Sequence, residues 1–367
     1  MWIKSINVHN CRILENVSLE FSPDLNIIRG LNASGKTSLL EALSILSTGR
    51  SFRSKQISSV ITHNKKKLLV TAEICNSNGI QKIGIEKQND QTKIRIDRKH
   101  IRSQAELSKY LPITIIDPDS VKLISGSPSL RRSYIDWIAF YIFPDFHYKW
   151  KTYQHILKQR NYCLKNKKYH STLNKWTEEL ASLQPELTQY RQSAIEILKP
   201  LFKKISDHLL KGIEVDILYT TGFPSSLDIN KDSLIEHYNK KLEQDIFLKR
   251  TSTGIHRADL KIMLNSQTAE SVASRGQLKL LSIALLIAQS TALLQDTTTS
   301  EKGIILVDDL SSELDAKNER CLFDFLTTLK QQLIITGTRQ ADIKKNDSVK
   351  MFHVKHGVIK PCEITLK

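Results

Sequence analysis

The chain has 367 residues, of which 40% are hydrophobic and 25% are charged, so it can bury a sizeable core and is not intrinsically disordered. This length suits one large domain or two ordinary ones. Lys and Arg number 54 against 38 Asp and Glu, a formal net charge of +16. Such a surplus favours a polyanionic partner, nucleic acid or an anionic membrane surface, although a merely solubilising basic surface gives the same count.

The cysteines and the apolar runs bear on cellular location. The cysteines are odd in number, far apart in sequence and include no C-x-x-C pair, which argues against a disulfide framework and a zinc site. Residues 1–6 alternate as in a strand and contain no signal-peptide core. The most apolar run, residues 280–288, is too short to cross a bilayer. We therefore expect a cytoplasmic protein with no membrane partner.

The first predicted elements are strands at residues 1–9 and 17–29, and they lead into a phosphate-binding loop. Residues 30–37 spell G-x-x-x-x-G-K-T and precede a leucine-rich helical segment. In such a loop, backbone N–H groups surround phosphate oxygens, Lys36 would reach the β- and γ-phosphates, and the Thr37 hydroxyl would bind Mg²⁺. The alternative is a chance Gly-Lys-Thr on a loop. The predicted nucleotide-binding residues here are Gly30, Asn32, Ala33, Ser34, Gly35, Lys36, Thr37 and Ser38.

The next stretch predicts a small antiparallel patch. Residues 48–54 are small and basic and read as a loop close to the nucleotide. A hairpin signal at residues 76–79 separates two alternating segments. The predicted strands of the patch are 68–75, 80–87 and 93–97. A further strand at residues 111–116 should stop at Asp117-Pro118.

A helical lobe follows. Residues 128–210 have helical spacing, with Pro144 and Pro185 as punctuation and Pro200 expected to kink or end a helix. Beyond it, the pattern predicts a strand at 213–219, a helix at 232–250 and a strand at 259–264. No heptad pattern is sustained, which excludes a long coiled-coil arm.

The last third returns to α/β alternation, with an apolar helix at residues 277–290, a helix at 316–329 and a short buried strand at 333–336. A phosphate loop needs a metal-binding strand beside it, so both ends of the chain should form one sheet. We therefore expect a nucleotide-binding head from residues 1–120 and 250–367, with residues 121–249 inserted as a mainly helical lobe.

The apolar strand at residues 303–307 ends in two carboxylates, as a Walker B strand does. A buried strand delivers its last side chain to the sheet edge beside the phosphate loop. Asp308 would hold Mg²⁺, and Asp309 would orient or deprotonate the attacking water, so Lys36, Asp308 and Asp309 are the predicted catalytic residues. The alternative is a strand followed by an acidic turn.

A second anion-binding turn precedes the apolar helix. Ser274, Gly276 and Gln277 place a hydroxyl and free N–H groups at a helix start, and an ordinary N-cap is the alternative. In ATP-binding-cassette heads, this element serves the γ-phosphate of the nucleotide held by the other subunit. Residues 311–315 then resemble a D-loop. We call the turn at residues 274–277 the signature turn. The order of phosphate loop, signature turn, Walker B strand and D-loop is the cassette order, and this order is more specific than any one of the motifs.

The chain resembles the RecF family of bacterial recombination mediators, which are related to SMC-type ATPases, over essentially its whole length. The motifs that carry the resemblance are residues 30–37, 49–54, 118–136, 254–260 and 306–315. The chain departs from the family pattern at Ser120, at Ser125 and at Ile255. Asp at position 309, where many cassette ATPases have Glu, is usual in this family and agrees with slow hydrolysis.

The resemblance implies an α/β fold: an ABC-type P-loop ATPase head, with a mixed central sheet and an antiparallel β patch, plus the inserted helical lobe. It further implies ATP and Mg²⁺ as cofactors, weak DNA-dependent ATP hydrolysis and an ATP-dependent homodimer. The implied partners are double-stranded or gapped DNA and a RecR-type mediator protein, in loading recombinase during DNA repair and replication restart.

Several residues and functions keep two interpretations. Arg131 and Arg132 could contact phosphates or form structural ion pairs, and His256 and Arg257 could lie at a dimer interface or in a structural hydrogen-bond cluster. Thr338 occupies the place of the cassette H-loop. The alternative functions are another P-loop kinase or GTPase, an SMC-like structural DNA clamp, and a transporter cassette subunit.

Overall fold

The computed structural model describes residues 1–89, 91–166, 171–295, 303–309, 314–337 and 349–362. The chain divides into two compact units, residues 1–120 with 283–367, and residues 121–282. The first boundary coincides with the expected one, whereas the second lies at 282/283 instead of 249/250. The reason is strand pairing, because residues 259–264 form a strand that pairs with residues 215–220 of the helical unit.

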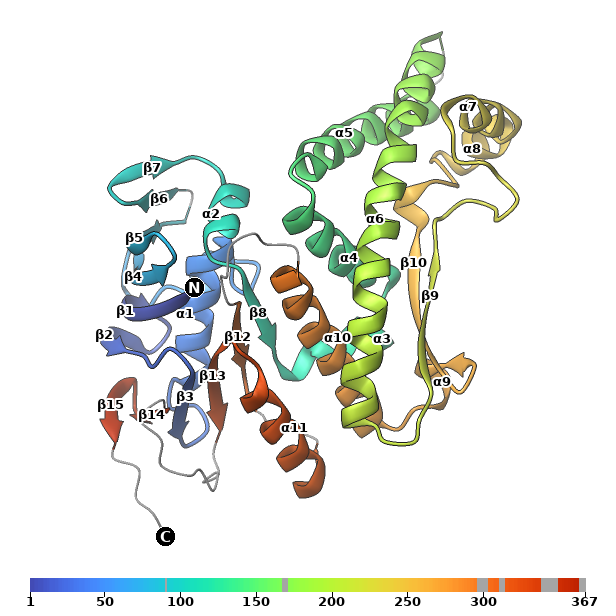
Figure 1. The fold of residues 1–367 in the computed structure, drawn as a ribbon. Coiled ribbons are helices and arrows are strands. Elements are labelled where there is room, and N and C mark those ends of the chain that lie inside the picture. Colours follow the sequence, from blue (N-terminus) through green and yellow to red (C-terminus); the bar gives the residue numbers. More distant parts are fainter. Residues whose placement is uncertain (90, 167–170, 296–302, 310–313, 338–348, 363–367) are drawn as a thin grey trace. The chain divides into compact units, whose positions relative to one another are not determined.

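The first unit contains two six-stranded sheets in its described residues (Figure 1). One is antiparallel throughout, with strand order β2-β1-β4-β5-β6-β7. Its strands are β1 (Trp2–Cys11), β2 (Leu14–Glu20), β4 (Leu68–Asn76), β5 (Gly79–Lys87), β6 (Thr92–Ile96) and β7 (Lys99–Ile101). The predicted antiparallel patch is therefore present, and it is larger than expected because the N-terminal strands join it.

The second sheet is mixed and has the order β15-β14-β3-β13-β12-β8, with only the edge strand β15 antiparallel to its neighbour. Its strands are β3 (Leu25–Gly30), β8 (Ile113–Ile116), β12 (Ile304–Val307), β13 (Gln332–Gly337), β14 (Val349–Lys355) and β15 (Val358–Cys362). Strand β3 pairs with β13 and β14, which confirms that both ends of the chain build one sheet.

Three differences from the sequence prediction have physical causes. Residues 17–29, predicted as one strand, turn after Glu20, so β2 joins one sheet and β3 the other. Pro185 and Pro200 lie inside the 37-residue helix α6 (Leu173–Leu209), so Pro185 marks no boundary and Pro200, expected to kink or end a helix, does not end one. Each proline removes one N–H donor, and burial of one apolar face along the whole helix compensates. Strands β14 and β15 are not predicted from the sequence, because they lack the long apolar run that marks β12.

Helix α1 (Lys36–Thr48) connects the two sheets of the first unit. It packs against β1, β4 and β5 of the antiparallel sheet and against β3, β8 and β13 of the mixed one. Leu39, Leu40 and Leu43 are fully buried in the core that both sheets share. The unit also contains helices α2 (Gln104–Tyr110) and α11 (Ala316–Thr328).

The second unit is mainly helical, with a small sheet in the order β11-β10-β9. Its helices are α3 (Lys122–Ser125), α4 (Pro128–Ile142), α5 (Phe146–Lys165), α6, α7 (Lys231–Lys240), α8 (Leu242–Leu248) and α9 (Ala269–Val272). Its strands are β9 (Val215–Thr220), β10 (Asp259–Leu264) and β11 (Gln267–Thr268). Helix α6 packs against α4, α5, α7 and β9, so it forms the centre of this unit.

Helix α10 (Arg275–Gln295) carries the apolar run that was judged too short to cross a membrane. By length and composition, residues 275–294 would suffice for a span, yet 72% of the apolar 18-residue window within them is buried inside the protein. Burial of this kind is typical of the core helix of a water-soluble domain, so the helix is weak evidence for a membrane.

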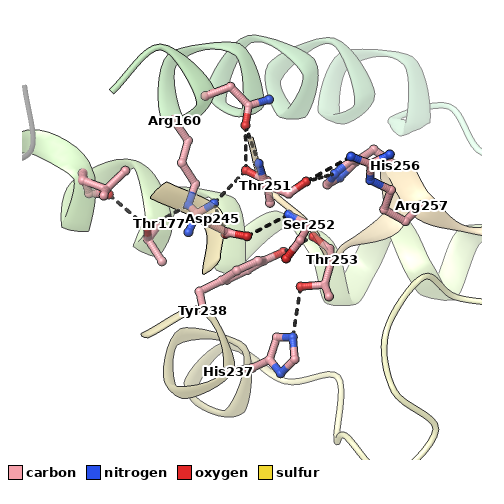
Figure 2. A network of polar contacts seen from close by, with 12 residues as sticks. Arg160, Thr177, His237, Tyr238, Asp245, Thr251, Ser252, Thr253, His256 and Arg257 are labelled. Carbon is pink, nitrogen blue, oxygen red and sulfur yellow. Dashed lines mark hydrogen bonds and ion pairs between the residues drawn. The ribbon is translucent and has the colours of Figure 1, made fainter. Parts of the chain in front are cut away.

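A buried polar network holds the segment between α8 and β10 (Figure 2). The side chains of Arg160 and Asp245 have no exposed surface, and Nη1 lies 2.9 Å from Oδ2. Arg160 also donates to the hydroxyls of Thr177 and Thr251, and Asp245 accepts the backbone N–H of Ser252. Since a buried charge is tolerated only when it is paired and hydrogen-bonded, these contacts specify the path of residues 251–253.

His256 extends this network. Its Nε2 lies 3.1 Å from the carbonyl oxygen of Thr251, and its Nδ1 lies 2.8 Å from the Tyr153 hydroxyl. A neutral ring that donates from Nε2 and accepts at Nδ1 satisfies both contacts. Burial lowers the pKa of His256 to about 4, and the charges of Arg257, Arg132 and Arg160 lower it further, against the Thr251 hydrogen bond. Of the two interpretations of His256, the structural hydrogen-bond cluster is the one that matches these contacts.

This environment predicts a pH-dependent stability. The unfolded chain protonates His256 near pH 6.5 and the folded chain near pH 4, so acidification between these values favours unfolding. Between pH 7.5 and pH 5, the free energy of unfolding should fall by about 2 kcal/mol more in the wild type than in His256→Gln. Urea titrations at both pH values measure this. Equal pH dependence of the two proteins would contradict it.

Candidate functional site

The phosphate-binding loop joins β3 to α1, as the motif requires. Ala33 and Gly35 have φ values of 62° and 116°, in the left-handed region. At Gly30, a Cβ would lie 2.4 Å from the carbonyl oxygen of Val354, so a side chain cannot fit. The Lys36 ammonium donates to the carbonyl oxygens of Gly30 at 2.7 Å and Leu31 at 2.9 Å. The Lys36 side chain thus folds back across the phosphate-binding loop and bonds to its backbone.

Two features of this loop suit an anionic ligand. Burial lowers the pKa of Lys36, while the nearby carboxylates of Asp309 and Asp308 act in the opposite direction. The Ser34 hydroxyl is buried and has no hydrogen-bond partner among the described residues. Buried polar atoms normally have a partner, and a phosphate oxygen would supply one.

Asp308 lies directly after β12, and two hydroxyl groups hold its carboxylate. Its Oδ1 accepts from Thr37 at 3.0 Å and from Thr336, on β13, at 2.8 Å. The Thr336 hydroxyl also accepts the backbone N–H of Asp309 at 3.0 Å, and Asp309 has a left-handed φ of 52°. Thr336 therefore positions both carboxylate residues. The sequence pattern predicts only a strand at Thr336, because its two hydrogen-bond partners are 28 and 27 positions away.

The oxygens of Thr37 and Asp308 fit a magnesium ion. Ligands on adjacent corners of an octahedron with bonds of about 2.1 Å lie about 3 Å apart, which matches the 3.0 Å between them. The described residues contain no cluster of three or more His, Cys, Asp or Glu side chains that could hold a metal. Magnesium needs no such cluster, since it keeps several waters and binds nucleotide phosphates.

A third carboxylate lies at the same sheet edge. Asp117 follows β8, whose last residue Ile116 pairs with Val307, and the N–H of Asp308 donates to the Ile116 carbonyl oxygen at 2.8 Å. Burial raises the pKa of Asp117, and the charges of Asp119 and Asp308 raise it further, against hydrogen bonds from Ser120. Asp117 was missed as a site residue because only the pairing of β8 with β12 brings it there.

The signature turn lies in the other unit and forms a reciprocal cap. The N–H of Ser274 donates to Oε1 of Gln277 at 2.8 Å, and the N–H of Gln277 donates to Oγ of Ser274 at 3.3 Å. This is the capping box of a helix start, so the N-cap interpretation describes the local geometry. Ser274 is also exposed, and a Cβ at Gly276 would meet open space. The turn can therefore receive a group from another molecule.

The remaining sequence candidates divide into structural residues and residues that are not described. Arg131 is buried and forms a bidentate pair with Asp259, while Arg132 donates to the carbonyl oxygen of Ala258. Arg131 is therefore a structural residue and not a phosphate contact. Residues 311–313 of the D-loop and Thr338 lie outside the described residues.

The double role of Thr336 generates a prediction. In Thr336→Val, one donor to Asp308 and one acceptor for the Asp309 N–H are lost at constant shape, which should cost about 1–3 kcal/mol of folding stability. Magnesium-dependent binding of a fluorescent ATP analogue should weaken as well. Thr336→Ser keeps the hydroxyl and is the matched control. Equal binding and equal urea midpoints for the Val and Ser variants would contradict the assigned role.

Comparisons with known proteins agree with this geometry. The family model described as RecF/RecN/SMC N terminal domain matches residues 2–360. The DNA replication and repair protein RecF of Psychromonas ingrahamii is 35% identical over 98% of this chain and 99% of its own length. The protein of the same name from Cellvibrio japonicus is 36% identical over 97% of this chain and 98% of its own length. A solved structure of the recombination mediator protein RecF with ATPrS has a TM-score of 0.86 at 27% identity, covering 99% of this chain and 98% of its own. Sequence, fold and site geometry agree, and the chain belongs to the RecF family of DNA replication and repair proteins, with the ABC-type ATPase fold of that family.

Proposed function

We propose that two copies of this chain bind two ATP molecules with Mg²⁺ between them, and that slow, DNA-dependent hydrolysis separates the copies again. The observation that carries the proposal is the meeting of Lys36, Thr37 and Asp308 at one sheet edge. There, Thr37 Oγ1 lies 3.0 Å from Asp308 Oδ1 and the charge of Asp308 acts on Lys36. This edge combines a phosphate loop, a metal-binding oxygen pair and a second carboxylate.

The roles of the residues follow from charge and position. Lys36 leaves the carbonyl oxygens of Gly30 and Leu31 and neutralises charge on the β- and γ-phosphates. Thr37 and Asp308 would hold Mg²⁺, which would supply charge neutralisation at the phosphates. Asp309, oriented by its hydrogen bond to Thr336, positions the attacking water. Phosphoryl transfer needs little more than this positioning and electrostatic stabilisation.

The proposed dimer assigns a role to the signature turn. Ser274, Gly276 and Gln277 of one copy would receive the γ-phosphate bound by the other copy. The exposure of Ser274 and the open space at Gly276 support this. ATP then stabilises the dimer because its terminal phosphate has ligands from both copies, and hydrolysis removes that differential contact.

The cellular partners follow from the family. Solved relatives are named as recombination mediators in the RecFOR pathway, and curated ones as DNA replication and repair proteins. We extend this to double-stranded or gapped DNA and a RecR-type protein as partners of this chain, in loading recombinase. The net charge of +16 supports a DNA partner, and five free cysteines suit the reducing cytoplasm.

Lys36→Ala tests the nucleotide site. Removal of the ammonium should weaken binding of a fluorescent ATP analogue by at least about tenfold, since hydrogen bonds to charged groups contribute about 1.5–3 kcal/mol each. ATP-dependent dimerisation in sedimentation velocity should disappear with it. Lys317→Ala, at an exposed position of α11, is the control. An intact ATP-driven dimer in Lys36→Ala would overturn the site.

Ser274→Arg tests the shared site. The variant should bind ATP as the wild type does, because the proposal assigns Ser274 to the nucleotide held by the other copy. It should fail to dimerise and should lose ATP hydrolysis by at least about tenfold, as expected when one transition-state donor is removed. Ser182→Arg, at an exposed position of α6, controls for the added charge. Hydrolysis at the wild-type rate in Ser274→Arg would disprove the shared site.

A further inference from the structure

The first unit has a cation-lined concavity away from the phosphate loop. This groove, of about 720 Å³, is formed by the segment from Gly49 to Ser58, the end of β5 and the start of α2. Three basic side chains line it: Arg50, Lys55 and Lys87. It begins where α1 ends, and the helix of 13 residues separates it from Lys36 by about 20 Å. It is therefore distinct from the nucleotide site, and we call it the basic groove.

Lys87 is the unusual member of the basic groove. It lies at the end of β5, and only 8% of the surface of the residue is exposed. Within the described residues, it has neither an ion pair nor a hydrogen-bond partner. Burial lowers the pKa of Lys87, and the charge of Arg50 lowers it further. The Lys87 ammonium is not among the fully buried polar atoms that lack a partner, so the stem is buried while the charged end opens into the groove, where an external anion would pair with it.

The other described lining residues have the chemistry that binds phosphate. The Ser58 hydroxyl and the amides of Asn89 and Gln104 are uncharged donors, whereas the hydroxyls of Ser51 and Ser54 are bonded within the protein. Among the described residues, to which Asp90 does not belong, no carboxylate and no aromatic ring lines the groove. Cations and hydroxyls suit backbone phosphates, whereas aromatic rings would be needed to stack unpaired bases. This composition favours a duplex over a single strand.

Buried contacts hold the loop that forms the groove. Glu41, on α1, has no exposed surface and accepts two hydrogen bonds from Arg12, at Nε and Nη2, each at 2.9 Å. The same carboxylate accepts from the Ser51 hydroxyl, and Arg12 donates to the carbonyl oxygen of Ser59. The loop is thereby anchored to rigid elements at both of its ends.

A second basic concavity continues the groove. It measures about 610 Å³ and shares Ser58 and Asn89 with the first. Its cationic lining residues are Arg12, Lys65 and Lys66, with His63 beside them. The described lining residues of this concavity also include no carboxylate. The two concavities share lining residues, so cationic side chains border both of them on the first unit.

We infer that the basic groove holds the phosphate backbone of duplex DNA, with Lys87, Arg50 and Lys55 as phosphate contacts. This inference rests on the DNA-binding function proposed above and adds the surface that would perform it. Contacts to the backbone carry no base specificity and release bound counterions. Binding through the groove should therefore be insensitive to sequence and steeply dependent on salt.

The test measures fluorescence anisotropy of labelled duplex DNA of about 30 base pairs with ATP present, across a salt series from about 50 to 300 mM. In Arg50→Gln/Lys55→Gln, the slope of log affinity against log salt should decrease by about 2, and affinity should fall at least about tenfold. Lys87→Met keeps the buried stem and should decrease the slope by about 1. The control Lys317→Gln/Lys330→Gln removes the same charge from exposed positions outside the groove and should bind as the wild type does.

The outcomes separate this inference from the proposed function. If the wild type fails to bind duplex DNA with ATP, the proposed DNA-binding function itself is wrong. If the wild type binds and the groove variants keep its slope and affinity, the groove assignment is wrong and the function stands. An equal loss for a single-stranded oligonucleotide of the same length would overturn the assignment to a duplex. Unchanged binding of the ATP analogue in all variants confirms that the nucleotide site is intact.

Discussion

The carboxylate of Asp308 is the point on which the candidate site depends. Its Oδ1 accepts from hydroxyls on α1 and β13, and the N–H of the same residue donates to the carbonyl oxygen of Ile116 after β8. Elements from three distant parts of the sequence thus meet at one residue. Because β12 is buried along its whole length, the position of this carboxylate is set by the sheet and not by a mobile loop.

The two units contribute differently to the proposed chemistry. The first unit supplies the phosphate loop, the proposed magnesium ligands and the basic groove, all connected through α1, whose start carries Lys36 and Thr37 and whose end borders the groove. The second unit supplies the signature turn as an exposed capping box. A nucleotide shared between two copies would make the pairing of the copies, and so the presentation of the groove, depend on ATP.

Local patterns predicted much of this structure, and long-range contacts account for what was missed. The phosphate loop, the Walker B strand and the capping turn each lie within a short stretch, so spacing alone identified them. Thr336 and Asp117 join the site only through the parallel pairing of β13, β12 and β8. The Arg12–Glu41 pair, 29 positions apart, likewise depends on packing of β1 against α1. The prolines of α6 end no helix because burial of a long helical face outweighs their local cost.

The strand order of the mixed sheet also constrains how the protein is made. Strand β3 pairs Leu25 with Leu333, and no described strand closer in sequence pairs with it. At a translation rate of about 5–20 residues per second, the ribosome needs roughly 15–60 s to synthesise the residues between them. During that time, β3 and the phosphate loop await their partners, whereas the contiguous second unit can complete its fold on the ribosome. Nascent chains of this architecture should therefore gain nucleotide binding only at the very end of synthesis.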